Sequence, residues 1–213
     1  IHYLDLGLYF NAFDEFVRKT NTNTNANDLF TGIELGPILA KEGQIENHLK
    51  PGQMVIVQIV KEPISTKGSR LTAEISLAGR NIVLLPFAKK VSISQKIASK
   101  EEKKRLETLV RSILPPNYGA IIRTAAEGKN AAILVSELKS LISKWESSWT
   151  KLSKSKNVQL LFTEYSKTTT ILRDLFNDSF SNIYVNDQKE YEEIKKYIAQ
   201  ISPDKEKIVK FYD

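Results

Sequence analysis

The chain has 213 residues, 41% of them hydrophobic and 26% charged, which is typical of a soluble globular protein with one large or two small domains. It has no cysteine and two histidines, which excludes disulfides, thiolate metal sites and a Cys/His nucleophile. No apolar run reaches the roughly 18 residues of a membrane span, so we expect a soluble, cytoplasmic protein. Ile1 is not a natural start, and we expect the true N-terminus to be missing.

The net charge of +6 is unevenly distributed. Between Lys61 and Arg105 the chain has eleven Lys/Arg and four Asp/Glu, a net charge of +7, which leaves about −1 for the remainder. A concentrated basic segment is typical of a polyanion-binding surface, but a solvated basic face has the same composition. Charge alone leaves both interpretations open.

The first half of the chain predicts short strands. We expect two strands within residues 1–13, a polar loop at 20–27 and a short helical turn at 35–40. Turn signals rich in Gly and Pro then separate three further strands, at 54–60, 71–77 and 82–86. Short strands at this spacing predict a small barrel of the OB type.

The second half alternates helices and strands. Ser99-x-x-Glu102 predicts a capping box that opens a helix ending near Leu114, and a strand follows at 118–122. Apolar residues at helical spacing, including Trp145 and Trp149 as packing anchors, predict a helix over 134–152. After residue 157 the pattern predicts an α/β segment, with strands at 158–163, 182–185 and 208–211 and helices at 167–176 and 188–201.

Arg123 and Thr124 directly follow the strand predicted at 118–122. The Arg fork and the Thr hydroxyl suit a phosphate, and the N-terminus of a nearby helix would add backbone N–H donors. Thr124-x-x-Glu127 also fits a helix capping box, with Arg123 merely solvated. The spacing alone favours the cap and leaves the phosphate site open.

Other residues suggest a face that binds single-stranded nucleic acid. Phe10 and Phe13 would lie on one barrel face bordered by Lys67, where rings and a cation could hold single-stranded nucleic acid. Burial in the barrel core is the alternative, and the pattern favours it for the two phenylalanines. The acidic residues of 174–193 fall on helix faces, and Asp187 fits a helix N-cap, so we predict no catalytic or metal-binding residue among them.

Several segments together resemble the amino-terminal half of the ribonuclease E/G family. The resemblance rests, in order along nearly the whole chain, on KPGQMVIVQIVKEP (50–63), TKG (66–68), LT (71–72), ISLAG (75–79) and IIRTA (121–125), with weaker likeness at 194–201 and 208–213. It implies a mixed α+β and α/β fold in three parts. These are an S1-type OB-fold RNA-binding domain at 1–78 whose first strand is missing, a 5′-sensor region at 79–156, and a partial RNase-H-like subdomain without nuclease activity at 157–213.

The resemblance also implies roles for individual residues. Phe13 and Lys67 match the RNA-binding barrel face, to which the pattern adds Phe10. The RNA 5′ end would be bound by the backbone of Gly79 and Val83 and by the side chains of Arg123 and Thr124.

The sequence departs from the family at one place near this site. Where some members have an Arg in the loop after the sensor strand, this chain reads Ser94-Gln95-Lys96. We therefore expect a weaker phosphate contact from Lys96 or Gln95, since a Lys lacks the Arg fork.

By resemblance, the chain is the RNA-recognition part of an endoribonuclease that acts on single-stranded RNA in RNA processing and decay and prefers a 5′-monophosphate. The family's catalytic carboxylates and zinc-linking cysteines would lie beyond Asp213, so the full-length enzyme is expected to use magnesium and this chain only to bind RNA. A homo-oligomer is compatible with the full-length protein. Two alternatives stay open: an OB-fold RNA-binding module without end sensing, such as a translation or ribosome-associated factor, and a catalytically competent RNase-H-like nuclease.

Overall fold

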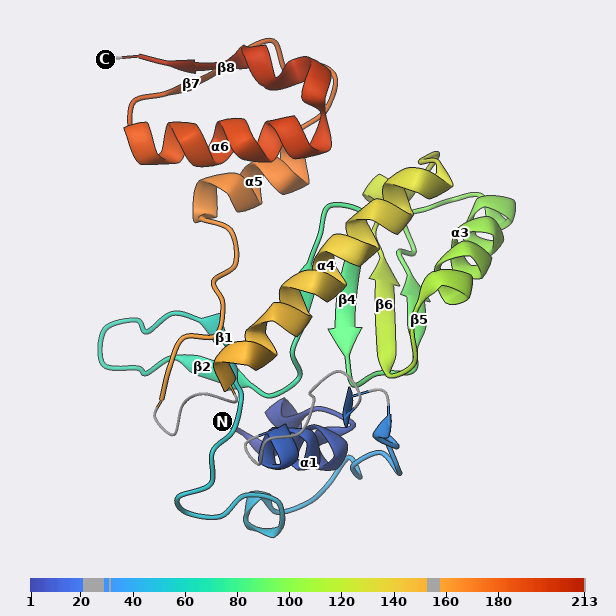
Figure 1. Cartoon of the computed structure of the whole chain (residues 1–213), viewed down its shortest axis with the longest axis vertical. Coiled ribbons are helices and arrows are strands. Elements are labelled where there is room, and N and C mark those ends of the chain that lie inside the picture. The colour runs from blue at the N-terminus through green and yellow to red at the C-terminus, as the bar shows by residue number, and fades with distance from the viewer. Residues whose placement is uncertain (21–28, 31, 153–157, 213) are drawn as a thin grey trace. The chain divides into compact units, whose positions relative to one another are not determined.

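The computed structural model describes residues 1–20, 29–30, 32–152 and 158–212 (Figure 1). These residues form two compact units, Ile1–Phe162 and Thr163–Asp213. Most of the polar loop predicted at 20–27 and the boundary predicted at 156/157 lie outside the described residues. The division into 1–78, 79–156 and 157–213 stays a prediction.

The N-terminal segment is helical, so the prediction of two strands within residues 1–13 was wrong. A 3-10 helix, Tyr3–Leu6, precedes α1, Phe10–Thr20. Phe10, Phe13 and Val17 recur every three or four residues and are all buried, which is the spacing of one helix face rather than of a strand. Residues 35–40, predicted as a helical turn, form no helix.

The strands of the first unit form two small sheets. In one, β1 (Gln58–Lys61) pairs antiparallel with β2 (Arg70–Thr72). In the other, the strand order is β3-β4-β6-β5, with bounds Leu77–Ala78, Ile82–Pro86, Tyr118–Ile122 and Val91–Ile93. The described residues contain no closed barrel, so the fold is mixed α+β and the predicted OB-fold is not confirmed.

Two helices, α3 (Lys100–Ile113) and α4 (Ala131–Leu152), cover the four-stranded sheet (Figure 1). The helix α4 contacts β4, α3 contacts β5 and β6, and the two helices contact each other. On one sheet face the cross-strand pairs Ile82–Ile122 and Leu84–Ala120 are fully buried. On the opposite face Ile121 is 39% exposed, and its partner Val83 is partly buried. The sheet therefore has one core face and one partly open face.

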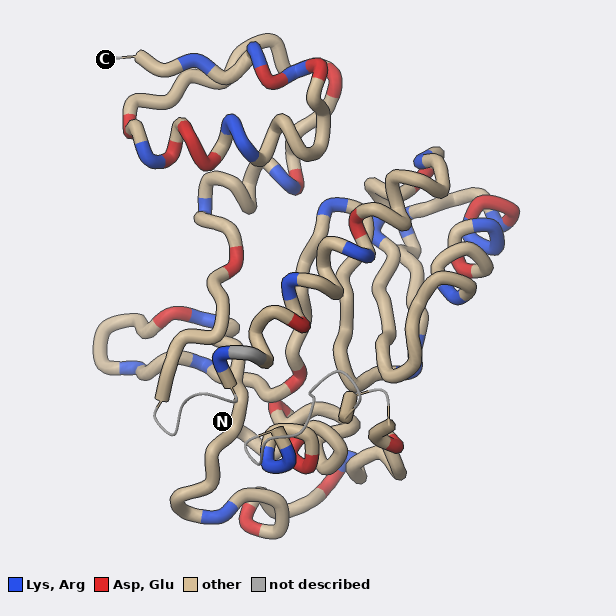
Figure 2. Tube along the Cα trace, viewed as in Figure 1, with Lys and Arg blue, Asp and Glu red and all other residues tan. Residues whose placement is uncertain are grey.

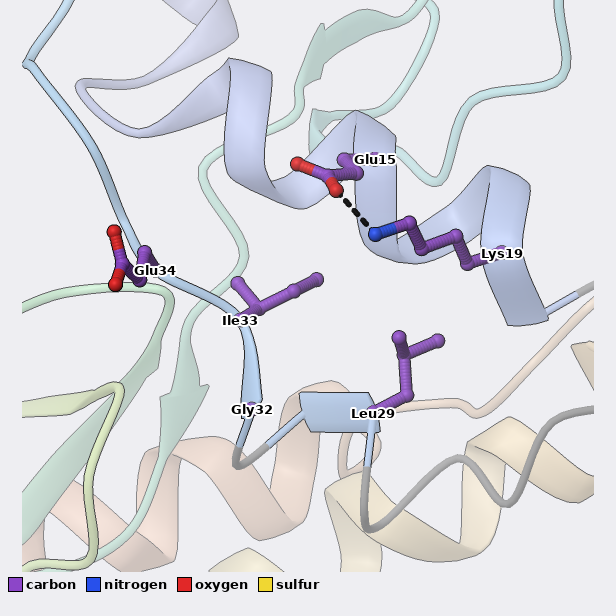
Figure 3. Close-up of a pocket in the computed structure, with 6 residues that line it drawn as sticks. All are labelled: Glu15, Lys19, Leu29, Gly32, Ile33 and Glu34. Atoms are coloured by element: carbon purple, nitrogen blue, oxygen red, sulfur yellow. Dashed lines mark ion pairs between the residues drawn. The ribbon is translucent and has the colours of Figure 1, made fainter.

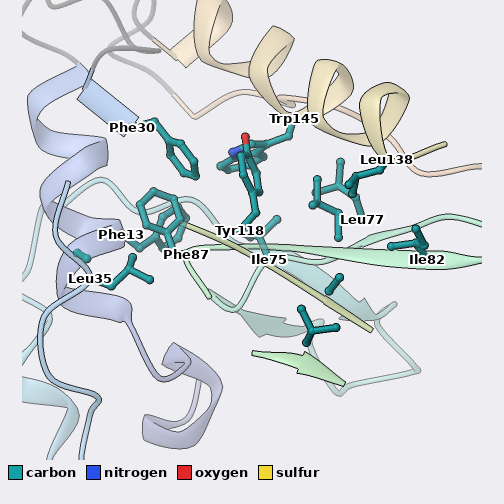
Figure 4. Packing of buried hydrophobic residues seen from close by; sticks show 14 of the residues in the cluster. Phe13, Phe30, Leu35, Ile75, Leu77, Ile82, Phe87, Tyr118, Leu138 and Trp145 are labelled. Carbon is teal, nitrogen blue, oxygen red and sulfur yellow. The ribbon is translucent and has the colours of Figure 1, made fainter. Parts of the chain in front are cut away.

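The buried hydrophobic residues of the first unit form a single cluster in space, whose members range in sequence from Leu6 to Leu152. Figure 4 shows aromatic rings from α1, from the loop after β4 and from α4 meeting in it. Trp145 and Trp149 are 0% and 2% exposed, which confirms the prediction that they are packing anchors. Two further 3-10 turns, Ile45–Asn47 and Thr124–Ala126, lie in connecting segments.

The second unit is a small α/β element with its own core. Its elements are α5 (Lys167–Leu175), β7 (Ile183–Val185), α6 (Gln188–Ile201), a 3-10 helix (Pro203–Ile208) and β8 (Val209–Phe211). The strands β7 and β8 pair in parallel, as the helix between them allows. Asp187 caps α6 by accepting the Glu190 N–H at 2.8 Å, which confirms the predicted N-cap. The strand predicted at 158–163 does not form, and Val158 is 93% exposed.

Candidate functional site: an anion-binding edge of the four-stranded sheet

Three segments meet at one edge of the four-stranded sheet. The strands β5 and β6 are parallel, so their carboxyl ends lie side by side, and Ser94 follows the first while Arg123 follows the second. The strand β4 runs antiparallel to β6, so its start at Ile82 lies beside Ile122. We call the residues gathered at this place the sheet edge: Gly79, Arg80, Asn81, Ser94, Arg123 and Thr124.

Arg123 is fixed at the sheet edge by both its backbone and its side chain. Its N–H donates to the carbonyl of Asn81 at 2.8 Å, and its guanidinium Nη1 donates to the carbonyl of Gly79 at 2.9 Å. The guanidinium is a rigid plane with five N–H donors, so one such contact sets the direction of the fork. A planar donor held in this way suits a phosphate oxygen pair.

Thr124 lies beside a second hydroxyl. Its Oγ1 is 2.8 Å from Oγ of Ser94, and Ser94 Oγ also accepts the backbone N–H of Lys96 at 3.3 Å. When Ser94 donates its proton to Thr124, the hydroxyl proton of Thr124 remains to be donated to another acceptor. Thr124 is exposed and Arg123 is partly buried, so the pair joins a braced cation to an accessible hydroxyl.

The prediction that Thr124 and Glu127 form a helix capping box was wrong. Only a 3-10 turn begins at Thr124, and the next helix, α4, begins at Ala131 with Asn130 Oδ1 accepting the Ile133 N–H at 3.0 Å. The pair therefore precedes α4 by several residues in the sequence and does not cap it. An anion at Arg123 and Thr124 would be bound by these side chains and not by the N-terminus of α4.

The loop after Thr124 is fastened to the first turn of α3. Glu102 accepts the Gly128 N–H at 2.9 Å and the Arg105 Nε at 2.6 Å, while Arg105 Nη2 donates to the carbonyl of Lys129 at 3.0 Å. The hydrogen bonds from Arg105 and from the Gly128 backbone lower the pKa of Glu102 to about 2. Ser99 caps this helix as predicted, but the Glu102 side chain binds the neighbouring loop, as described above. Helix α3 thus holds the loop that follows Arg123 and Thr124.

Gly79 and Val83, predicted as backbone contacts, take different positions. Gly79 lies at the sheet edge, where its N–H donates to the Ile82 carbonyl at 2.9 Å and its carbonyl accepts from Arg123. A carbonyl oxygen has a second lone pair, so Gly79 can accept one further donor. Val83 is one residue inside the ladder, paired with Ile121 on one side and Ala78 on the other. The structure thus brings Gly79, but not Val83, next to Arg123.

Phe10 and Phe13, predicted on an RNA-binding barrel face, lie in α1 and are both 2% exposed. The ring of Phe13 packs against Phe87, with centroids 5.0 Å apart. A ring buried to this extent cannot stack on a base without leaving the core, so the structure does not bring these two residues to a surface. The two rings are buried because both lie on the apolar face of helix α1. Lys67, the third residue predicted on this face, is exposed in the connection between β1 and β2.

The basic segment is partly neutralised within the chain. Figure 2 shows Lys and Arg positions interspersed with acidic positions along α3, where Glu102 pairs with Arg105 and Glu107 with Arg111. Gln95 and Lys96, predicted as a weaker phosphate contact, are both exposed and follow Ser94 in the loop after β5. The backbone N–H of Lys96 donates to Ser94 Oγ, which joins this loop to the sheet edge.

Nothing in the described residues fits a metal centre. They contain no group of three or more His, Cys, Asp or Glu side chains that could hold an ion. A shallow pocket lined by Glu15, Lys19, Leu29, Gly32, Ile33 and Glu34 carries an ion pair of 2.5 Å between Lys19 and Glu15 (Figure 3). It contains none of the sheet-edge residues.

Among the described helices, none is long and apolar enough to cross a membrane.

Sequence comparisons place this architecture in a known family. The model of the ribonuclease E/G family matches residues 76–213. The chain is 34% identical over 171 residues to "Ribonuclease E" of Nostoc sp. strain PCC 7120, covering 79% of this chain and 25% of that protein. It is 32% identical over 205 residues to the "Ribonuclease E/G-like protein" of Pyropia yezoensis, covering 92% and 40%, and 33% identical over 160 residues to "Ribonuclease G" of Escherichia coli K12, covering 75% and 33%.

The chain therefore belongs to the ribonuclease E/G family, as its sequence resemblance predicted. It spans between 25% and 40% of the length of these three relatives.

Two residues at the site were missed from the sequence. Asn81 supplies the carbonyl that accepts the Arg123 N–H, and Glu137 on α4 binds the turn that contains Asn81. Asn81 had a weak signal, because a Gly followed by two polar residues before an apolar strand is typical of a turn. Glu137 had none, because its polar position on an amphipathic helix is equally expected of a solvated side chain.

Proposed function

We propose that this chain recognises single-stranded RNA with a 5′-monophosphate, as the RNA-binding part of an endoribonuclease that acts in RNA processing and decay. Membership of the ribonuclease E/G family supports an RNA substrate. The observation that carries the end-sensing part is the bracing of Arg123: its guanidinium is directed by the Gly79 carbonyl, and a hydroxyl pair lies at the next residue.

The chemistry of this arrangement matches a terminal phosphate. A 5′-monophosphate has three terminal oxygens that share a charge of about −1.5 to −2 and that an Arg fork and a hydroxyl can bind together. An internal phosphodiester has two such oxygens that share a single charge, and it is flanked by sugars. Each charge-assisted hydrogen bond contributes about 1.5 kcal/mol or more. One to two such bonds predict a preference for the 5′-monophosphate over a 5′-hydroxyl of about tenfold to a hundredfold.

Other parts of the account come from the family resemblance. We propose that the exposed Lys67 contributes to binding the RNA beyond its first nucleotide, in part through release of counterions. We also propose that the exposed Lys96 or Gln95 makes a weaker contact with the 5′-phosphate. We also propose a cytoplasmic location and, for the longer protein, magnesium-dependent cleavage.

The test compares two fluorescent oligonucleotides of one sequence, one with a 5′-monophosphate and one with a 5′-hydroxyl. Arg123→Ala should bring the two affinities within about twofold of each other while leaving 5′-hydroxyl affinity little changed. Arg111→Ala is the matched control: it removes the same charge from an exposed pair with Glu107 on α3 and should preserve the preference. An equal loss for both oligonucleotides in Arg123→Ala would identify an RNA-binding module without end sensing.

A further inference from the structure

Glu137 binds the turn between β3 and β4 with nearly every acceptor position of its carboxylate. Its Oε1 accepts the backbone N–H of Arg80 and, at 3.0 Å, that of Asn81. Its Oε2 accepts the Asn81 side-chain Nδ2 at 2.8 Å. A carboxylate that accepts several N–H donors, two of them backbone amides, occupies a small anion-binding nest.

The turn that Glu137 holds is the same turn that holds Arg123. The carbonyl of Gly79 accepts Arg123 Nη1 at 2.9 Å, and the carbonyl of Asn81 accepts the Arg123 N–H at 2.8 Å. The N–H groups of Arg80 and Asn81 bind Glu137, while the carbonyls of Gly79 and Asn81 bind Arg123. The three-residue turn is therefore a rigid link between a carboxylate on α4 and the guanidinium at the sheet edge.

The identity of residue 79 is consistent with this link. A Cβ at Gly79 would lie 2.7 Å from the Ile82 carbonyl oxygen and would also overlap Glu137 Oε1. Glu137 can approach the turn closely because residue 79 has no side chain. Without the carboxylate, the backbone N–H groups of the turn would need other acceptors. The hydrogen bonds that fix the orientation of the turn, and through it that of Arg123, would be lost.

We propose that Glu137 is a positioning residue for RNA 5′-end recognition, which sets the Arg123 guanidinium through the Gly79–Asn81 turn. This inference rests on the proposed function. Glu137 itself does not touch the RNA, because its carboxylate repels phosphate and is occupied by the turn. Its effect on the preference for a 5′-monophosphate therefore passes through Arg123.

Glu137→Gln tests the inference, because the amide keeps the size of the side chain but presents an NH₂ donor to a group of N–H donors. We expect the preference for the 5′-monophosphate over the 5′-hydroxyl oligonucleotide to fall by about three- to tenfold. This is the effect expected when one charge-assisted hydrogen bond from Arg123 to the phosphate is weakened by poor alignment. Glu127→Gln is the matched control. It removes the same charge from an exposed side chain close to Arg123 in sequence and should leave the preference unchanged.

A double-mutant cycle separates positioning from a general structural role. In the Arg123→Ala background, Glu137→Gln should cause no further change in the affinity for either oligonucleotide, because the residue through which it acts is gone. An additive loss, or a Glu137→Gln variant with wild-type preference, would overturn the inference. If Glu137→Gln does not fold by circular dichroism, Glu137→Asp replaces it: this variant keeps the charge but shortens the side chain and so withdraws the carboxylate from the N–H groups of Arg80 and Asn81, and unchanged preference would again overturn the inference.

The same cycle distinguishes this inference from the proposed function. A wild-type chain that binds both oligonucleotides equally contradicts the proposed function and, with it, the role of Glu137. A wild-type preference that Arg123→Ala abolishes and Glu137→Gln leaves intact contradicts the role of Glu137 alone.

Discussion

Phe13 provides a sharp test of whether the N-terminal aromatic residues serve folding or RNA binding. Its side chain is 2% exposed, and its ring lies 5.0 Å from that of Phe87. Removing a buried Phe side chain costs about 3–5 kcal/mol, out of a total of about 5–15 kcal/mol for a typical domain. Phe13→Ala should therefore lose a large part of its stability, whereas Phe13→Leu should lose less than about 1.5 kcal/mol.

The assay is urea unfolding followed by tryptophan fluorescence, because Trp145 and Trp149 are buried in the same core. Leu8→Ala is the control: Leu8 is 51% exposed just before α1, and its loss should change stability by no more than about 0.5 kcal/mol. RNA affinity of the folded Phe13→Leu variant should equal that of the wild type. Unchanged stability of Phe13→Ala together with RNA binding weakened by about 1–3 kcal/mol, as for a lost base stack, would refute the assignment to the core.

Three further predictions concern the sheet edge and its supports. Since the pKa of Glu102 is lowered from 4.5 to about 2 in the folded chain, its contribution to stability is complete above about pH 4.5 and is lost as the pH falls toward 2. The melting temperatures of Glu102→Gln and wild type should therefore differ most at neutral pH and converge across that window, and a constant difference would contradict this. Gly79→Ala should destabilise the chain by about 1–3 kcal/mol in thermal or urea unfolding, because its Cβ would crowd the Ile82 carbonyl; wild-type stability would show that the turn relaxes freely. Ser94→Ala removes the hydroxyl beside Thr124 and should weaken 5′-monophosphate binding by about two- to tenfold without altering 5′-hydroxyl binding; equal weakening of both would assign Ser94 a general role.

The sequence predicted the second half of the fold better than the first. Helix α6 was predicted with its observed bounds, and β6 likewise, because apolar periodicity, an N-cap and Pro–Pro or Gly turns agree there. Residues 1–13 were misread because a short apolar run fits both a strand and a buried helix face, and only the tertiary packing of Phe10 and Phe13 decides between them.

The candidate site was predictable in its chemistry but not in its supports. Arg123 and Thr124 could be found because they follow a strand and match a family motif. The residues that hold Arg123 in place could not be found in this way. Gly79, Asn81 and Glu137 are up to 58 residues apart in sequence and meet only when β4, β6 and α4 pack together. The Thr124 cap was predicted wrongly because the spacing of a capping box does not encode whether the helix starts at once or, as here, at Ala131.

The most direct test of the central claim is a titration of the wild-type chain with two oligonucleotides that differ only at the 5′ end, at one fixed salt concentration. We predict that the 5′-monophosphate binds about ten- to a hundredfold more tightly than the 5′-hydroxyl, because Arg123 and Thr124 form hydrogen bonds with it that the hydroxyl cannot replace. Dissociation constants that agree within about twofold would contradict the account.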